Sequence, residues 1–350
     1  MGERNQSPKV ALFQEKILES TQQPKSKKKQ KCERLSKHSD IAIIGTGPSG
    51  LSAALSLQQA GFLGNITLYE RDSDFHARRE GYGLTLTYNP SKSSPLQKLG
   101  LLEQLAREDC PSRSHYVFDS IGNILGYYGN DFSIERGYGQ RGNLRVPRQT
   151  LRRIMMKTLL QRNEEQDGKI KIEWGKKLAS YEHHRSRDSI SKPLTLRFQD
   201  GTRATADLLI GADGVNSTVL TQLLSSPTNA MVGRNVDNFE VPSNVSSASL
   251  SYIGVFIVVG ITTNFFHPLL DERGFYTLDG THRLFTMPFE GSRLDDLAFE
   301  SNYNNSEGKT SRRYMWQLSY QLDSEEEARK LVKRGPEAIL EEVMSRTQTW

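Results

Sequence analysis

Cysteine is scarce in this sequence, and its scarcity excludes one class of protein. The 350 residues include two cysteines, Cys32 and Cys110. Two cysteines cannot form the disulfide framework that stabilises small secreted domains. The N-terminus also lacks an apolar signal core followed by small residues at a cleavage site. Both absences predict a reducing compartment, and we expect the chain to be cytoplasmic.

Long apolar runs are also missing. The longest, YIGVFIVVGI at residues 252–261, is about half as long as the roughly 20 residues that a membrane-spanning helix needs. Its β-branched and aromatic residues are instead typical of a buried strand. No transmembrane segment is therefore expected.

The sequence has no excess of charge outside its first 40 residues. Residues 1–40 contain ten Lys or Arg and five Asp or Glu, which accounts for the whole formal net charge of +5. A core without a basic excess gives no reason to expect nucleic-acid binding. Residues 1–39 are predicted to be a disordered basic tail. The run KSKKKQK at residues 25–31 leaves open a nuclear-localisation signal or a patch for an anionic surface.

From residue 40 onward the sequence is typical of an α/β fold. IAII at residues 41–44 is an all-apolar strand, as in a parallel sheet that is covered on both faces. A helix is predicted at residues 49–61 and a second strand at residues 65–70. Together they form one βαβ unit of about 30 residues, the size of a dinucleotide-binding unit.

Further elements follow from the same periodic signals, and strands dominate after about residue 230. Helices are predicted at residues 94–108 (with a break), 146–162, 324–335 and 336–346, and strands at 82–88, 115–129 (a hairpin), 169–174, 194–211 (a hairpin and a further strand), 251–262, 274–278, 282–289 and 313–322.

Three glycines between the first strand and the first helix form a G-x-G-x-x-G motif. Gly45 permits the sharp turn, Gly47 lets a pyrophosphate approach the backbone, and Gly50 lets the helix pack closely on the strand. The helix N-terminus at Pro48 and Ser49 presents unpaired N–H groups and a partial positive charge. This motif predicts a binding site for a diphosphate.

A carboxylate stands where such a unit binds ribose. Glu70 ends the second strand, twenty residues after Gly50. Hydrogen bonds from ribose hydroxyls to Glu70 would contribute about 1.5–3 kcal/mol. A 2′-phosphate would place a second anion beside Glu70, so we expect FAD or NAD here and not NADP. The alternative is an ordinary glycine-rich turn, which the strand, the helix and the acid together disfavour.

A later stretch distinguishes FAD from NAD. DLLIGADGVNSTV at residues 207–219 ends a strand in Asp213 and Gly214. With IAIIGTGPSGLSAALSLQQAGFLGNITLYER, ARREGYGLTL and LRVPRQTLRRIMM before it, the chain resembles the class A flavoprotein monooxygenases, the para-hydroxybenzoate hydroxylase-like aromatic hydroxylases. The resemblance begins at about residue 40, and after residue 230 it is limited to the general sequence pattern, without a matching motif.

The resemblance implies an α/β fold with two interleaved domains. A Rossmann-like FAD-binding domain, a mixed or parallel sheet with helices, is expected at residues 40–230 with inserted β segments. A smaller β-sheet substrate domain is expected at residues 231–322, followed by helices at residues 323–350. Tyr276, on a predicted strand of the substrate domain, is expected to pack within the sheet.

The resemblance also implies where FAD binds. Arg79 would contact the FAD pyrophosphate or lie near the flavin, and Arg148 would also reach FAD, although either could be a surface charge. Asp213 and Gly214 would serve FAD and nicotinamide binding, although Asp213 could instead cap the next helix. The implied cofactor-binding residues are Gly45, Gly47, Pro48, Ser49, Gly50, Glu70, Arg71, Arg79, Arg148, Asp213 and Gly214.

Two departures from the family pattern affect these expectations. Leu220 stands where the family usually has an arginine, three residues after Ser217, which weakens the expectation of normal nicotinamide docking. No Gly-Asp dipeptide occurs in the chain, although the family binds FAD with one. We therefore expect a C-terminally truncated chain that binds FAD weakly or folds poorly, with a complete but divergent protein as the alternative.

The activity that the resemblance implies is hydroxylation of a small organic, commonly phenol-like, molecule. NADH or NADPH would reduce FAD, and the reduced flavin would activate O2. No metal is needed, no catalytic residue can be assigned, and the oligomeric state stays open. Two alternatives remain: another FAD- or NAD-dependent oxidoreductase without oxygen insertion, and an inactive homologue that acts through its basic tail.

Overall fold

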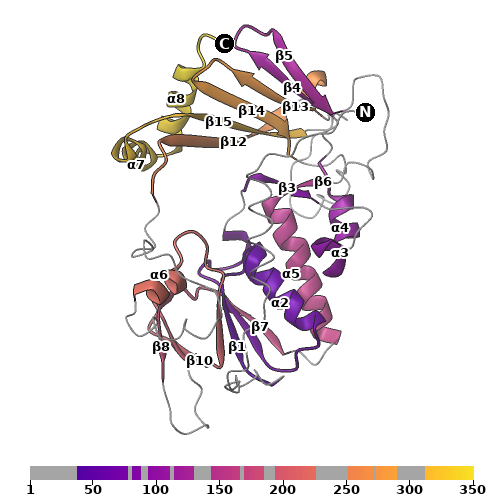
Figure 1. Cartoon of the computed structure of the whole chain (residues 1–350), viewed down its shortest axis with the longest axis vertical. Coiled ribbons are helices and arrows are strands. Elements are labelled where there is room, and N and C mark those ends of the chain that lie inside the picture. Colours follow the sequence, from indigo (N-terminus) through magenta and orange to yellow (C-terminus); the bar gives the residue numbers. More distant parts are fainter. Residues whose placement is uncertain are drawn as a thin grey trace, which may run out of the picture. The chain divides into compact units, whose positions relative to one another are not determined.

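The computed structural model describes the main elements of the chain (Figure 1). Arg79 and nearly all of the predicted tail at residues 1–39 lie outside the described residues, so the predictions about them stay predictions. The described residues are 38–77, 81–87, 94–110, 114–129, 143–165, 169–184, 194–225, 251–265, 267–270, 273–289 and 312–350.

A parallel four-stranded sheet lies at the centre of the predicted βαβ region. Its strand order is β11-β1-β2-β7, and Ile44 of β1 lies opposite Tyr69 of β2 and Gly211 of β11. All four residues of β1 are buried, as the apolar run predicts for a strand covered on both faces. The strands are β1 (Ile41–Ile44), β2 (Ile66–Tyr69), β7 (Ile170–Glu173) and β11 (Leu208–Gly211).

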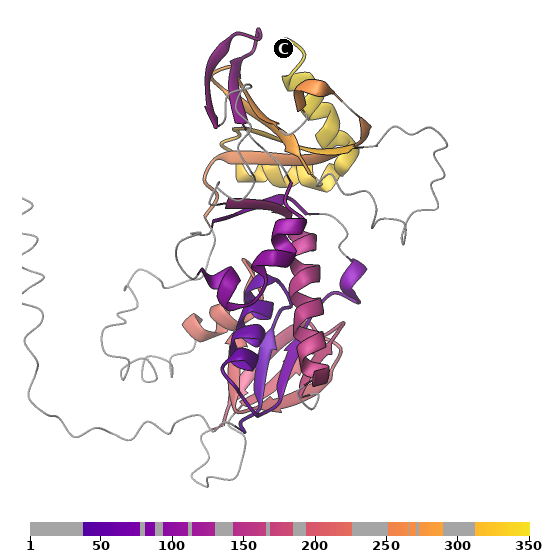
Figure 2. The same cartoon turned by 90° about the vertical axis from the view of Figure 1, so that its right-hand side faces the viewer.

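Two helices cover one face of this sheet. Helices α2 (Pro48–Gln59) and α5 (Arg148–Glu165) lie side by side against it (Figures 1 and 2). Their buried side chains include Leu51, Leu55 and Leu159, which join Ile41 and Ile43 in one core. Each fully buried leucine contributes about 1.5–3 kcal/mol by leaving water. The core therefore fixes the position of the helix that follows the glycine motif.

Helix α5 begins two residues later than the sequence predicts. Pro147 is the last residue of β6 (Asn143–Pro147), where it lies opposite Gly83 of β3 (Gly83–Thr87). The predicted helix start at residue 146 was therefore wrong, because the chain is still paired as a strand at Val146 and Pro147. Arg148 consequently stands at the point where the β3–β6 ribbon meets the helix.

The other face of the parallel sheet is covered by a small antiparallel sheet. It contains β8 (Leu178–His183), β9 (Leu194–Phe198) and β10 (Arg203–Ala206), in the order β10-β9-β8. Ala42 and Ile44 of β1 pack against this sheet, whereas Ile41 and Ile43 face the helices. This alternation is the side-chain period of a strand. The predicted hairpin turn is confirmed, with Gly201 in the left-handed region at φ +83°.

A second, six-stranded sheet takes strands from two distant parts of the sequence. Its order is β12-β15-β14-β13-β4-β5, and β13 pairs in parallel with β4. The predicted strands and the hairpin are confirmed. The strands are β4 (Ser114–Asp119), β5 (Ile124–Gly129), β12 (Val255–Phe265), β13 (Arg273–Leu278), β14 (His282–Pro288) and β15 (Arg312–Gln321).

Strand β12 is not the fully buried strand that its composition predicts. It lies at one edge of the six-stranded sheet, and the exposed fractions of Val255, Ile257 and Val259 are 41%, 54% and 44%. Val258, on the opposite face, is buried. Apolar composition does not show whether a strand has one covered face or two. The run ADLLIGADG at residues 206–214 likewise predicts a buried strand, but β11 lies at the edge of the parallel sheet and three of its four residues are half-buried.

The predicted helices near the end of the described chain are present. The hydroxyl of Ser324 accepts a hydrogen bond from the amide of Glu327 at 3.2 Å and so caps α7. Val343 of α8 packs on Leu318 and Tyr320 of the six-stranded sheet. The remaining helices are α3 (Pro95–Lys98), α4 (Leu102–Arg107), α6 (Thr218–Ser225), α7 (Glu325–Arg334) and α8 (Pro336–Arg346), with single turns at Phe75–Ala77 and Pro268–Leu270.

In the part of the chain that the structure describes, no helix combines the length and the apolar character needed to cross a membrane.

The predicted break in the helix at residues 94–108 is confirmed, because Gly100 takes the left-handed conformation at φ +69° between α3 and α4.

The contact between α2 and β1 gives a direct test of the fold. A Cβ atom at Gly50 would lie 1.9 Å from the carbonyl oxygen of Gly45. We expect Gly50→Ala to lower the free energy of unfolding by at least about 1–3 kcal/mol, since backbone must move to accept the methyl group. Urea unfolding measures this loss. Gly126→Ala is the control, because no atom lies within 4 Å of a Cβ there; equal stability of the two variants would contradict the described packing.

Candidate functional site

The glycine motif forms a tight loop between β1 and α2. Gly45 has φ +101°, and a Cβ atom on it would lie 2.4 Å from the carbonyl oxygen of Ala212. The amide of Gly45 donates to the carbonyl of Tyr69 at 2.8 Å. Position 45 therefore requires glycine for two reasons: its backbone is in the left-handed region, and the segment after β11 leaves no room for a Cβ atom.

The N-terminus of α2 opens at this loop. Gly47 is its N-cap in an extended conformation, no side chain caps the helix there, and Pro48 occupies the first turn. First-turn amides without an intrahelical partner can bind an anion. A Cβ atom on Gly47 would lie 3.5 Å from Nη2 of Arg148. The guanidinium of Arg148 thus stands beside the loop, and its predicted contact with FAD stays a prediction.

Glu70 is hydrogen-bonded to Thr46 of the glycine loop. Its Oε2 accepts hydrogen bonds from the amide of Thr46 at 2.8 Å and from the Thr46 hydroxyl at 2.7 Å. Its Oε1 accepts from the amide of Asp72 at 3.2 Å. Glu70 and Thr46 are both buried. The predicted ribose carboxylate therefore also holds the glycine loop against the end of β2.

The environment of Glu70 keeps its carboxylate charged. Burial raises the pKa of Glu70, but the hydroxyl and amide of Thr46, the amide of Asp72 and the positive charge of Arg152 lower it more. The net pKa lies below the ordinary value. Glu70 is consequently an anionic hydrogen-bond acceptor at neutral pH.

Arg152 is a buried partner of this carboxylate that the sequence reasoning missed. Its Nη2 lies 3.7 Å from Oε2 of Glu70, and the side chains of Arg152 and Glu70 are 4% and 9% exposed. The signal that could have found it is its spacing, since residues four apart lie on the same helix face and Arg152 follows Arg148 by one turn of α5.

Asp213 caps the helix that follows it. Its Oδ1 accepts from the hydroxyl of Ser217 at 2.5 Å, and its Oδ2 accepts from the amides of Thr218 at 2.7 Å and Val219 at 3.2 Å. This is the capping geometry left open by the sequence. Asp213 and Gly214, which has φ +83°, also border the cleft described next.

These elements enclose one cleft of about 800 Å³, which includes space open to solvent. Every strand of the parallel sheet contributes residues from beyond its carboxyl end, where ligands bind in open α/β sheets. Seven of the predicted residues line it, whereas Pro48, Ser49 and Gly50 do not, and Arg79 is outside the described residues. The predicted residues in the lining are Gly45, Gly47, Glu70, Arg71, Arg148, Asp213 and Gly214.

Positive charge prevails in the cleft. Lys176 and Lys177, which the sequence reasoning also missed, follow β7 at the same edge of the sheet. Their position could have been expected from the parallel pairing of β7 with β2. Five basic and three acidic side chains line the cleft, so it carries the excess charge that suits a diphosphate. The acidic residues are Glu70, Asp72 and Asp213, and the basic ones are Arg71, Arg148, Arg152, Lys176 and Lys177.

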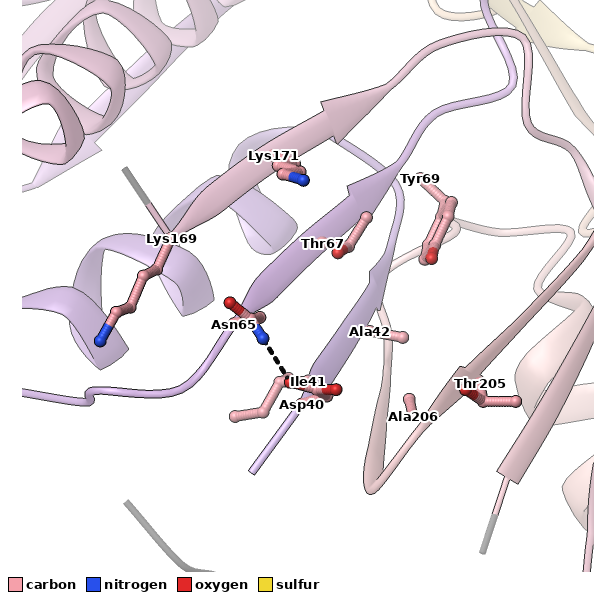
Figure 3. A pocket seen from close by; sticks show the side chains of 10 residues that line it. All are labelled: Asp40, Ile41, Ala42, Asn65, Thr67, Tyr69, Lys169, Lys171, Thr205 and Ala206. Carbon is pink, nitrogen blue, oxygen red and sulfur yellow. Dashed lines mark hydrogen bonds between the residues drawn. The ribbon is translucent and has the colours of Figure 1, made fainter. Parts of the chain in front are cut away.

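A second pocket lies at the opposite ends of the same strands. Figure 3 shows its lining, which includes Asp40, Asn65 and Lys169, the residues just before β1, β2 and β7. The Asn65 amide donates to Asp40 Oδ1 at 2.7 Å, and Lys169 Nζ donates to the carbonyl of Leu63 at 2.9 Å. The glycine loop does not border this pocket, although Tyr69 lines both this pocket and the cleft.

Comparison with known sequences finds a family profile whose match includes the residues that line this cleft. The sequence profile of the FAD binding domain family matches residues 38–253, more than half of the chain. YetM of Bacillus subtilis, named as an FAD-dependent monooxygenase, is 33% identical over 188 residues, 54% of this chain and 45% of YetM. An FAD-dependent urate hydroxylase of Mycolicibacterium vanbaalenii is 29% identical over 188 residues, 53% of this chain and 42% of the hydroxylase. The chain spans less than half the length of these curated relatives.

Comparison with solved structures gives the same fold. The crystal structure of an HpxO variant from Klebsiella pneumoniae with FAD has a TM-score of 0.56 with this chain. The two are 18% identical, and the likeness covers 89% of this chain and 64% of HpxO. At this identity the likeness establishes the fold alone, and that fold is the Rossmann-like α/β architecture that the sequence predicts.

The buried carboxylate gives a prediction for stability against pH. We expect Glu70→Gln to lower the free energy of unfolding at pH 7 by about 3 kcal/mol, because Arg152 then stays buried without a counter-charge. The folded-state pKa of Glu70 is lowered, so the wild-type advantage is complete above the unfolded-state pKa of 4.5 and is lost as the pH falls through the folded-state pKa.

Urea unfolding of both proteins at pH 7 and at pH 3 measures this difference. Glu108→Gln is the control, since Glu108 forms an exposed pair with Arg153 at 3.0 Å and such a pair contributes at most about 1 kcal/mol. A wild-type advantage that is the same at both pH values would show that the charge of Glu70 does not stabilise the fold.

Proposed function

Because the chain belongs to the FAD binding domain family of the class A flavin monooxygenases, we propose that it is an FAD-dependent hydroxylase. It would use NADH or NADPH and O2 to insert one oxygen atom into a small aromatic molecule. The observation that carries this proposal is the cleft that joins the glycine loop, Glu70, Arg148 and Asp213 beyond the ends of four parallel strands.

The residues of the cleft fit the ADP half of FAD. The amides at the start of α2 and the guanidinium of Arg148 face the place of the diphosphate, and Glu70 offers a charged acceptor to ribose. Gly47 leaves the space that a Cβ atom would take from the diphosphate. Bound FAD would supply the redox chemistry, accepting a hydride from the nicotinamide and activating O2. The chain's own residues bind and orient the cofactor.

An aromatic surface of the six-stranded sheet supports an aromatic substrate. The rings of Tyr276 and Phe285 are stacked with centroids 4.6 Å apart, and the imidazole of His115 lies 5.9 Å from Phe285. Burial and the nearby charge of Arg145 lower the pKa of His115 to about 4, so the imidazole is neutral at pH 7. His115 is buried, and the guanidinium of Arg283 lies 4.9 Å from the ring centroid of Tyr276. The half-buried rings of Tyr276 and Phe285 are therefore the ones that could stack with a substrate ring.

This surface faces the cofactor half of the chain. Strand register places Phe285 on the same face as Met287 and Met315. The amide of Gly83 on β3 lies 3.3 Å from the sulfur of Met315, and β3 leads through β6 to Arg148. The urate hydroxylase among the relatives acts, by its name, on a heteroaromatic ring, which supports the same class of substrate.

Cofactor content and oxygen use test the proposal. We expect the protein, purified after addition of FAD, to be yellow and to oxidise NADH or NADPH only when O2 and a hydroxylated or heteroaromatic substrate are present. Mass spectrometry with labelled O2 should place one labelled oxygen in the product. Turnover without O2 and with an artificial acceptor would favour the alternative of a dehydrogenase. A protein without colour or turnover would favour the inactive homologue.

We place the activity in the cytoplasm, and fractionation of cells checks this.

Arg148 offers a specific test of the cofactor site. We expect Arg148→Met to weaken FAD binding roughly 10- to 100-fold, the equivalent of about 1.5–3 kcal/mol for a lost hydrogen bond to a charged group. Flavin fluorescence quenching measures the Kd. Arg153→Met is the matched control on the same helix, since Arg153 is half-exposed and pairs with Glu108. Equal Kd values for the two variants would remove Arg148 from the site.

A further inference from the structure

We propose that Arg152 and Thr46 form a buried clamp that positions Glu70 so that only its Oε1 can accept a ribose hydroxyl. The proposal rests on the function proposed above, because it presumes that the cleft binds the adenosine end of FAD. It adds two positioning residues to the site, neither of which the glycine motif or the ribose carboxylate assigns.

Each nitrogen of the Arg152 guanidinium lies within hydrogen-bond distance of a protein acceptor. Its Nε donates to the carbonyl of Thr46 at 3.0 Å, its Nη2 to the Thr46 hydroxyl at 2.8 Å, and its Nη1 lies 3.5 Å from the carbonyl of Phe75. Its guanidinium also lies 5.0 Å from the ring centroid of Phe75 and 5.6 Å from that of Trp174. A guanidinium held at every nitrogen and against two rings has one fixed orientation, so it acts through its neighbours.

Thr46 transmits this orientation to Glu70. Its hydroxyl accepts from Arg152 and donates to Oε2 of Glu70 at 2.7 Å, while its amide donates to the same oxygen at 2.8 Å. A carboxylate oxygen has two lone pairs, so Thr46 occupies both acceptor positions of Oε2. Oε1 receives the amide of Asp72 at 3.2 Å and keeps one acceptor position. Glu70 therefore presents one oxygen to ribose and not two.

The clamp also supplies charge. Glu70 is buried, and an unpaired carboxylate in that position would take up a proton. Arg152 compensates its charge from 3.7 Å on the side of Oε2. The same guanidinium holds the carbonyl of Thr46, in the middle of the Gly45–Gly47 turn. It thus sets the spacing between the phosphate-binding amides and the ribose-binding oxygen.

A double-mutant cycle on the full chain tests the clamp. The variants are Arg152→Met, Glu70→Gln and both together, and the Kd values for FAD and for ADP are measured by fluorescence quenching and calorimetry. We expect each single variant to weaken both ligands roughly tenfold. The double variant should be no weaker than the weaker single variant, because Arg152 acts through Glu70. Multiplied effects, or an unchanged Kd for Arg152→Met, would overturn the proposal.

The pH dependence of binding separates positioning from a general loss of structure. Wild-type Kd should be constant from pH 8 to pH 5, whereas the Kd of Arg152→Met should begin to rise at a higher pH than that of the wild type, because loss of the Arg152 charge raises the pKa of Glu70. A pH-independent loss of affinity would assign Arg152 to folding alone. Arg162→Met is the control: it removes a hydrogen bond from the same helix to the carbonyl of Leu99 and should leave the Kd unchanged.

Thr46→Val keeps the proposal testable if Arg152→Met does not fold. It preserves the shape of the buried side chain and the Arg152–Glu70 pair but removes the hydroxyl between them. We expect weaker FAD and ADP binding, and restoration by Thr46→Ser; equal binding by wild type and Thr46→Val would overturn the clamp. A wild-type chain that binds neither FAD nor ADP would instead refute the proposed function, which distinguishes the two failures.

Discussion

The candidate site depends on the hydrogen bonds between Thr46 and Glu70. They join the loop after β1 to the end of β2, so the first turn of α2 and the carboxylate are held at one spacing. A buried carboxylate costs several kcal/mol unless donors satisfy it. Here the donors that offset this cost are the backbone and hydroxyl of the loop itself. The same hydrogen bonds therefore stabilise the fold and arrange the candidate site.

Close backbone packing holds the loop from its other sides. Gly50 lets α2 approach the carbonyl of Gly45, and Gly45 in turn lies against the carbonyl of Ala212 after β11. Because these contacts leave no room for a Cβ atom, the N-terminus of α2 is fixed close to the ends of the strands. The partial positive charge of the helix and the basic residues beyond β2 and β7 then act on the same cleft.

The local features of this arrangement could be predicted from the sequence. The apolar run of β1, the glycine spacing and the offset of Glu70 each follow from rules that involve neighbours in the chain. The pairing of β4 with β13 could not, since about 160 residues separate them and nothing in either strand specifies its partner. The edge position of β12 was missed for the same reason: exposure depends on which strands pair, and composition does not record that.

The two arginines of α5 show why the site was predicted only in part. Arg148 and Arg152 are the same residue type on the same helix face, yet one stands beside Gly47 and the other is buried behind Thr46. The difference arises from tertiary contacts: Phe75 and Trp174 pack against Arg152, and Glu70 compensates its charge. Motif spacing identifies the residues that face a ligand. Thr46, an unspecified position within the glycine motif, and Arg152, on a helix outside it, hold those residues in place, and their role is found only when the packing is known.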